Sequence, residues 1–69
     1  MNKYLIIIEK ADGNYSSYSP DLPGCIAVGD TVEETRDKMK SAINFHIEGL
    51  RAEGLTVPNP EAISEYIAV

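Results

Sequence analysis

Cys25 and His46 are the single cysteine and the single histidine of this 69-residue sequence, and they are the obvious candidates for nucleophilic or acid–base chemistry. A catalytic thiol needs a base within hydrogen-bond reach and an electropositive setting that lowers its pKa. The ionisable residues near Cys25 are Asp21 and Asp30, whose negative charges would raise that pKa instead. We therefore interpret Cys25 as a small buried apolar residue, and we predict no catalytic site.

His46 falls among apolar residues at helical spacing, between Ile43 and Leu50. The simpler interpretation is a partly buried ring whose nitrogen meets a backbone group. The alternative is a contact sensitive to pH or to a partner. Apart from carboxylates, no second metal ligand lies at helical spacing from His46, so we predict no metal site.

Three acids, Glu33, Glu34 and Asp37, lie close together and could suggest a two-metal nuclease. Such a site also needs carboxylates from the strands, and the first predicted strand offers only Glu9, at its end. Acids at the start of a helix are explained by capping and by the helix dipole. We predict that the chain holds no cofactor and is not an enzyme.

The elements that position these residues fit one domain, residues 1–69, with a net charge of −5 and a pI near 4.6. That charge lacks the basic footprint of nucleic-acid binders and favours basic partners. No signal peptide or membrane-spanning run is visible, which predicts a cytoplasmic protein. One cysteine cannot form an internal disulfide, so a domain this small is expected to gain stability by oligomerisation.

Three short strands are predicted first, at residues 4–8 ("YLIII"), 15–19 ("YSSYS") and 25–28 ("CIAV"). Asp12-Gly13 is a strong hairpin signal between the first two strands. Short links between successive strands favour an antiparallel meander.

A helix is predicted from about residue 32 to about residue 53. Thr31 is a suitable N-cap, Glu34 completes a capping box, and Glu34 can pair with Lys38. Gly54 stands at the expected position after the helix. The apolar stripe consists of Val32, Met39, Ala42, Ile43, His46, Ile47 and Leu50.

The segment between the second and third strands contains Pro20, Asp21, Leu22, Pro23 and Gly24. Aspartate, proline and glycine in this order predict a rigid turn in which the glycine has positive φ. Rigid loops also serve as binding sites, so Asp21, Leu22, Pro23 and Gly24 are the predicted partner-binding residues.

Residues 62–69 ("AISEYIAV") predict a fourth strand, giving the α+β order β-β-β-α-β. A right-handed crossover would place that strand beside the first, in sheet order 3-2-1-4, with the helix packed on one face. Leu5 and Ile7 then point to the other face, which the helix cannot cover. We predict that they form the interface of a homo-oligomer, a dimer or larger.

The stretch "YSPDLPGCIAVGDTVEE", with "KYLIIIEK" before it and "EGLTVPNP" after the helix, resembles the HicB-like antitoxin family over nearly the whole chain. The resemblance implies a partial ribonuclease-H-like fold. It also implies a partner of the HicA type, a small basic RNA-cleaving toxin that the antitoxin neutralises. Many family members carry a C-terminal operator-binding domain, whereas this sequence stops at Val69, so we expect no direct DNA or RNA binding.

The predicted function is therefore that of an antitoxin that binds and occludes such a toxin. An alternative is a solitary homo-oligomeric interaction or scaffold protein with no toxin partner. A vestigial metal-dependent nuclease is a third alternative. A small basic open reading frame beside this one would favour the antitoxin.

Overall fold

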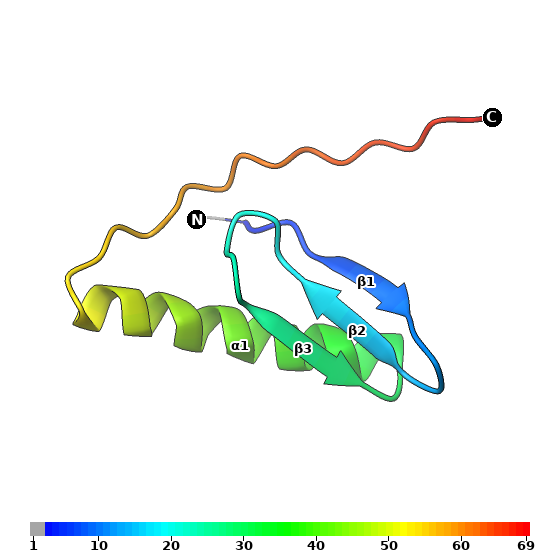
Figure 1. Cartoon of the computed structure of the whole chain (residues 1–69), viewed down its shortest axis with the longest axis horizontal. Helices are drawn as coiled ribbons and strands as arrows, with labels where there is room; N and C mark the ends of the chain where they lie inside the picture. Colours follow the sequence, from blue (N-terminus) through cyan, green and yellow to red (C-terminus); the bar gives the residue numbers. More distant parts are fainter. Residues whose placement is uncertain (1–2) are drawn as a thin grey trace.

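The computed structural model describes residues 3–69, in which three strands are followed by one helix (Figure 1). The strands β1 (Ile7–Lys10), β2 (Tyr15–Tyr18) and β3 (Ile26–Gly29) form an antiparallel sheet in the order β1-β2-β3. The helix α1 (Val32–Ala52) lies across one face of that sheet. The predicted α+β class, and the predicted order of the first three strands, are confirmed.

The first hairpin closes through the predicted turn. Lys10 and Tyr15 pair at its end, and the backbone N–H of Ala11 donates to the carbonyl oxygen of Asn14 at 2.8 Å. Gly13 has a φ of 83°, a conformation that a residue with a Cβ adopts only with strain.

β1 begins at Ile7, three residues later than predicted, and the reason lies in the opposite strand. The register pairs Ile7 with Tyr18, so its continuation would place Leu5 opposite Pro20, which has no backbone N–H. The hydroxyl of Ser19 donates to the carbonyl oxygen of Leu5 at 2.9 Å instead. A side-chain hydrogen bond therefore takes the place of the backbone hydrogen bonds between the two strands at this point.

α1 has nearly the predicted bounds because both ends carry local caps. The backbone N–H of Glu34 donates to the Thr31 hydroxyl at 3.0 Å, as a helix N-cap requires. The Glu34 carboxylate accepts from the N–H of Asp30 at 3.4 Å, one residue before the N-cap, so the reciprocal bond of the predicted capping box is displaced by one residue.

The helix ends in a Schellman motif. Gly54 has a φ of 70° and donates to the carbonyl of Arg51, while Leu55 donates to the carbonyl of Leu50. These bonds satisfy two carbonyls that the helix itself leaves unpaired.

The core lies between the sheet and α1 and is small. Its buried apolar members are Leu22, Cys25 and Met39. The partly buried residues that pack against them are Tyr4, Ile6, Ala27, Ala42 and Ile43.

The predicted fourth strand does not form. Residues 55–69 run as an extended tail without strand pairing (Figure 1). The predicted sheet order 3-2-1-4 is therefore wrong in its fourth strand, which does not pair with β1 in the single chain. A groove of about 490 Å³, lined by Leu5–Ile8 and Ser64–Tyr66, lies between the tail and the start of the sheet. Residues with strand propensity form a strand only where a backbone ladder reaches them.

Candidate functional site

The face of the sheet that α1 leaves uncovered is the main exposed apolar surface built from regular structure. Gly29 faces α1, because a Cβ there would lie 2.7 Å from the Thr35 hydroxyl oxygen. Strand residues alternate between faces, so Ile26 and Val28 point away from the helix. The strand register adds Tyr18 and Ile7 to the same face. We call Ile7, Tyr18, Ile26 and Val28 the open face.

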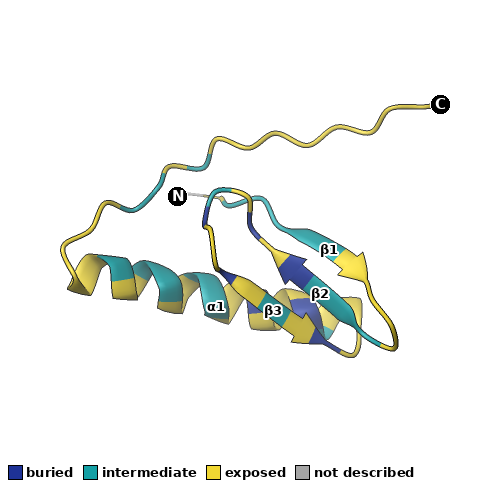
Figure 2. Ribbon diagram, in the orientation of Figure 1, coloured by how far each residue is buried: buried dark blue, intermediate teal, exposed yellow. Residues whose placement is uncertain are grey.

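The open face is exposed in the single chain. Ile26 is 67% exposed, Val28 48% and Tyr18 43%, while Ile7 is half-buried. Figure 2 shows yellow, exposed positions alternating with less exposed ones along β3. Contiguous exposed apolar residues of this kind mark interaction surfaces more often than isolated ones do.

The loop of residues 19–25 borders the open face, because it directly joins Tyr18 to Ile26. Two backbone bonds shape it: Leu22 N–H to the Ser19 carbonyl and Cys25 N–H to the Leu22 carbonyl, both at 3.1 Å. Gly24 has a φ of 83°, as the turn prediction requires.

The four predicted partner-binding residues of this loop are divided by the structure. Pro23 and Gly24 are exposed and Asp21 is half-buried, but Leu22 is 0% exposed and belongs to the core. Leu22 therefore anchors the loop, and its side chain is not available to a partner in this conformation.

Cys25 is buried, 4% exposed, as the sequence predicted. Burial raises the pKa of its thiol above the ordinary value. The predicted direction is right but the predicted cause is wrong, since the raised pKa comes from desolvation and not from the neighbouring aspartates.

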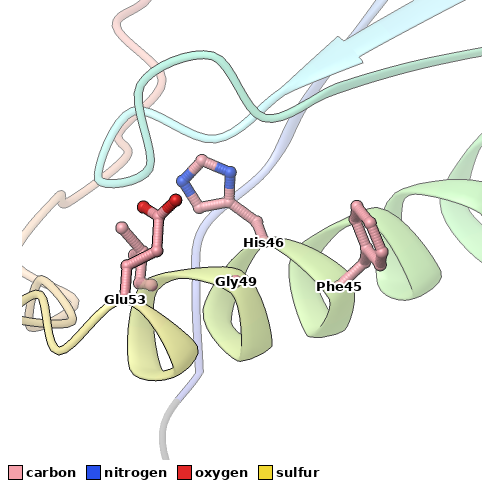
Figure 3. A pocket seen from close by; sticks show the side chains of 5 residues that line it. Phe45, His46, Gly49 and Glu53 are labelled. Carbon is pink, nitrogen blue, oxygen red and sulfur yellow. The ribbon is translucent and has the colours of Figure 1, made fainter.

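His46 is half-buried and lines a shallow groove of about 260 Å³ on α1, together with Phe45, Gly49, Leu50 and Glu53. Figure 3 shows the His46 and Glu53 side chains on the same side of the helix, with Phe45 pointing elsewhere. The predicted partial burial is confirmed.

The acids at the start of α1 serve the helix. Glu34 Oε1 lies 2.9 Å from Lys38 Nζ, which confirms the predicted pair. The hydrogen bond from Lys38, followed by that from the Asp30 backbone, lowers the pKa of the Glu34 carboxyl, and the same pair raises the pKa of Lys38. Within residues 3–69, no group of three or more His, Cys, Asp or Glu side chains is arranged to hold a metal ion.

Two hydrogen bonds fasten the first part of the tail to the domain. The Tyr4 hydroxyl donates to the Pro58 carbonyl oxygen at 2.5 Å, and the Ala62 N–H donates to Asp21 Oδ2 at 3.2 Å. Asp21 thus has a structural role that its place in a turn did not indicate. None of the described helices is long and apolar enough to cross a membrane.

Tyr18, Ile26 and Val28 are the exposed residues that sequence reasoning missed. The signal was present in "CIAVG", where small residues (Cys25, Ala27, Gly29) alternate with large apolar ones. The small residues pack under the helix, which forces the large ones outward. The prediction identified a strand here without assigning its residues to the two faces of the sheet.

The chain matches one described protein family and several known proteins. Residues 4–69 match the family described as "HicB_like antitoxin of bacterial toxin-antitoxin system". The chain is 42% identical, over 64 residues, to an uncharacterized 14.9 kDa protein of Haemophilus phage HP1, an alignment that covers 93% of this chain and 48% of the phage protein. The chain therefore spans about half the length of that relative.

Two further relatives are similar to the chain over most of their length. A UPF0150 protein of Synechocystis is 37% identical over 67 residues, covering 96% of this chain and 85% of the relative. A UPF0150 protein of Thermoplasma acidophilum is 39% identical over 61 residues, with 87% and 88% covered. No solved structure matches the chain.

Proposed function

The chain belongs to the HicB-like antitoxin family, and from this premise we propose that it binds and neutralises a small basic RNA-cleaving toxin of the HicA type. The observation that carries the proposal is the open face, where Tyr18, Ile26 and Val28 are exposed on a rigid sheet. Aromatic and branched apolar side chains on a flat surface supply binding energy when a partner covers them.

The charge of the chain supports a basic partner. A net charge of −5 attracts a cationic protein over several ångströms and speeds the encounter. Glu9 lies on the same side of β1 as Ile7 and adds an exposed carboxylate to the border of the open face. We place this encounter in the cytoplasm, where an RNA-cleaving toxin finds its substrate.

The loop of residues 19–25 extends the proposed contact. Pro23 and Gly24 are exposed, and Asp21 is held by its bond to Ala62, so the loop offers a preorganised border to the open face. A preformed surface loses little entropy on binding. Leu22 contributes by holding the loop in place from the core.

In this proposal the antitoxin acts by occlusion and performs no chemistry of its own. Its acidic charge opposes the phosphate contacts on which nucleic-acid affinity mainly depends. We therefore propose that the chain by itself binds neither DNA nor RNA, and a gel shift of its own promoter fragment by the purified protein would overturn this.

Calorimetry with a purified HicA-type toxin, sought as a small basic open reading frame beside this gene, tests the proposed surface. The double variant Ile26→Thr, Val28→Thr keeps residues that suit a strand while it removes exposed apolar surface. We expect the Kd for the toxin to rise by about tenfold or more, as for truncation of central interface residues.

The matched control for this experiment is Phe45→Gln. Phe45 is 79% exposed and lies on α1, which is not part of the sheet, so the control removes a large exposed apolar side chain without altering the open face. Unchanged affinity of the double variant, or equal weakening by the control, would contradict the proposed surface.

A solitary homo-oligomeric interaction protein without a toxin is the second candidate function. The exposed apolar tail favours it, because Ile63 and Ile67 are more than four-fifths exposed in the single chain. Leu5 and Ile7, the proposed oligomer-interface residues, line or border the groove beside that tail. Absence of a basic toxin gene beside this one would favour the solitary protein.

A further inference from the structure

We propose that residues 62–69 of one copy dock as a strand on the free edge of β1 in a second copy, so that two copies exchange their tails. We call residues 62–69 the tail strand. The receiving edge shares Ile7 with the open face but does not include Tyr18, Ile26 or Val28, and the proposal does not depend on the existence of a toxin.

The receiving site is the outer edge of the sheet beside β1. β1 pairs with β2 on one side, and within residues 3–69 no strand pairs with its other side. Leu5–Ile8, which run into this strand, are half-buried apolar residues along the groove. An unpaired apolar edge exposes a row of backbone donors and acceptors and is a ready template for another strand.

The tail strand has the composition of the missing partner. With a two-residue period, Ile63, Ile67 and Val69 share one side with Glu65, and the three apolar residues are highly exposed in the single chain. Figure 2 shows the end of the chain in yellow throughout. Branched apolar residues that stay extended in water bury their surface only when a second surface is supplied.

The two tethers explain why the tail strand does not close on its own edge. The bond from Tyr4 to Pro58 fixes the chain before the tail strand, and the bond from Ala62 to Asp21 fixes the first residue of the tail strand. Past these bonds the tail runs apart from β1, and the groove of about 490 Å³ lies between them. The groove is thus open to an extended segment from another molecule.

Two-fold symmetry determines the direction in which the exchanged tail strand runs relative to β1. The tail and β1 of one copy run in broadly the same direction (Figure 1). A two-fold axis perpendicular to the strands reverses the second copy, so its tail strand enters antiparallel to β1. The exchange is reciprocal and closed, so it produces a dimer and not a fibre.

The shape of the single chain agrees with an exchanged segment. Its radius of gyration is 13.1 Å, with extents of 41 × 28 × 19 Å. A compact domain of this length has a radius of gyration of about 11 Å. The difference reflects the tail, which reaches beyond the sheet (Figure 1).

Light scattering of the full chain at micromolar concentration is the first test. We expect twice the chain mass of 7.6 kDa for the natural protein. Ile67→Pro removes a backbone donor within the tail strand and should give a monomer. Thr56→Pro is the control, since Thr56 is exposed in the same tail but lies outside the tail strand, and this variant should remain a dimer. A monomeric natural protein, or a dimeric Ile67→Pro variant, would overturn the proposal.

Cross-linking distinguishes exchange from any other dimer. A tagged Leu5→Cys chain is coexpressed with an untagged chain carrying Ile63→Cys, Tyr66→Cys or Ile67→Cys in turn, all with Cys25→Ala. A short bismaleimide should join tagged to untagged chains for at least one tail position. If no tail position joins the two chains while the protein remains dimeric, the dimer forms through another surface and the proposal is wrong.

Discussion

At Gly29 the backbone of β3 comes so close to α1 that a single methyl group has no room. A Cβ at Gly29 would lie 2.7 Å from Thr35 Oγ1 and 2.8 Å from the Thr35 backbone nitrogen. Thr35 is fully buried and its hydroxyl donates to the Thr31 carbonyl at 2.7 Å, so it cannot move aside without losing that bond. We expect Gly29→Ala to lower the free energy of unfolding by about 1–3 kcal/mol, as overpacking does.

Urea denaturation checks this prediction, and Gly49→Ala is its matched control. A Cβ at Gly49 meets nothing within 4 Å, and alanine in a helix interior is favoured over glycine by about 0.5–1 kcal/mol. The two glycine-to-alanine changes should therefore have opposite signs. Equal stability of Gly29→Ala and the natural protein would show that the strand and helix are not in close contact.

Cys25 gives a prediction about reactivity. Burial and a raised pKa leave little accessible thiolate, so iodoacetamide at pH 8 should label the folded protein many times more slowly than the urea-unfolded protein. Because the folded pKa is raised, the stabilisation from the neutral thiol is complete below the unfolded pKa and declines as pH rises through the folded pKa. Rapid labelling of the folded chain would contradict the structural role of Cys25.

At the level of the elements, α1 depends on its N-cap. The Thr31 hydroxyl accepts from the Glu34 N–H at 3.0 Å, and Thr31→Ala removes that acceptor. We expect a loss of about 1 kcal/mol in the free energy of unfolding. Thr56→Ala, an exposed threonine outside the helix, is the control and should leave the urea midpoint unchanged. Equal urea midpoints for Thr31→Ala and Thr56→Ala would mean that the N-cap contributes nothing measurable to the stability of the fold.

The helix was predictable because its signals are local. Thr31, Glu34 and Gly54 determine its ends through bonds to residues within five positions, and these bonds exist in the structure. The start of β1 was not predictable in this way. It depends on Pro20 and Ser19, which meet Leu5 only after the hairpin has formed.

The pairing of the tail could not be predicted from the sequence, for a different reason. Residues 62–69 have strand composition, but a strand needs a neighbour, and composition does not say whose edge it will be. The bonds from Tyr4 to Pro58 and from Ala62 to Asp21 join residues more than forty positions apart. No local pattern indicates such bonds.

The candidate site was predicted in part. Leu5 and Ile7 were expected on the face that the helix cannot cover; the register places Ile7 on that face, and both residues are half-buried in the single chain. Tyr18, Ile26 and Val28 were missed because their outward direction follows from where Gly29 meets the helix, which is a tertiary contact. Leu22 was placed among the partner-binding residues because rigid loops often serve as binding sites, but its side chain lies in the core.

For the whole molecule, the two proposed surfaces are compatible. The open face lies on the side of the sheet opposite α1, and the tail exchange uses the edge of β1. A dimer that forms through the edge would cover Ile7 but leave Tyr18, Ile26 and Val28 of both copies available. We therefore expect one toxin to bind per antitoxin chain.

Titration of toxin-catalysed RNA cleavage tests whether the chain neutralises a toxin. A fixed amount of a purified HicA-type toxin, sought as a small basic open reading frame beside this gene, is mixed with increasing amounts of the purified full chain, and cleavage of a labelled RNA is followed. We expect cleavage to fall to background at one antitoxin chain per toxin, and we expect the Ile26→Thr, Val28→Thr variant to require a large excess. Undiminished cleavage at saturating amounts of the natural chain would contradict it.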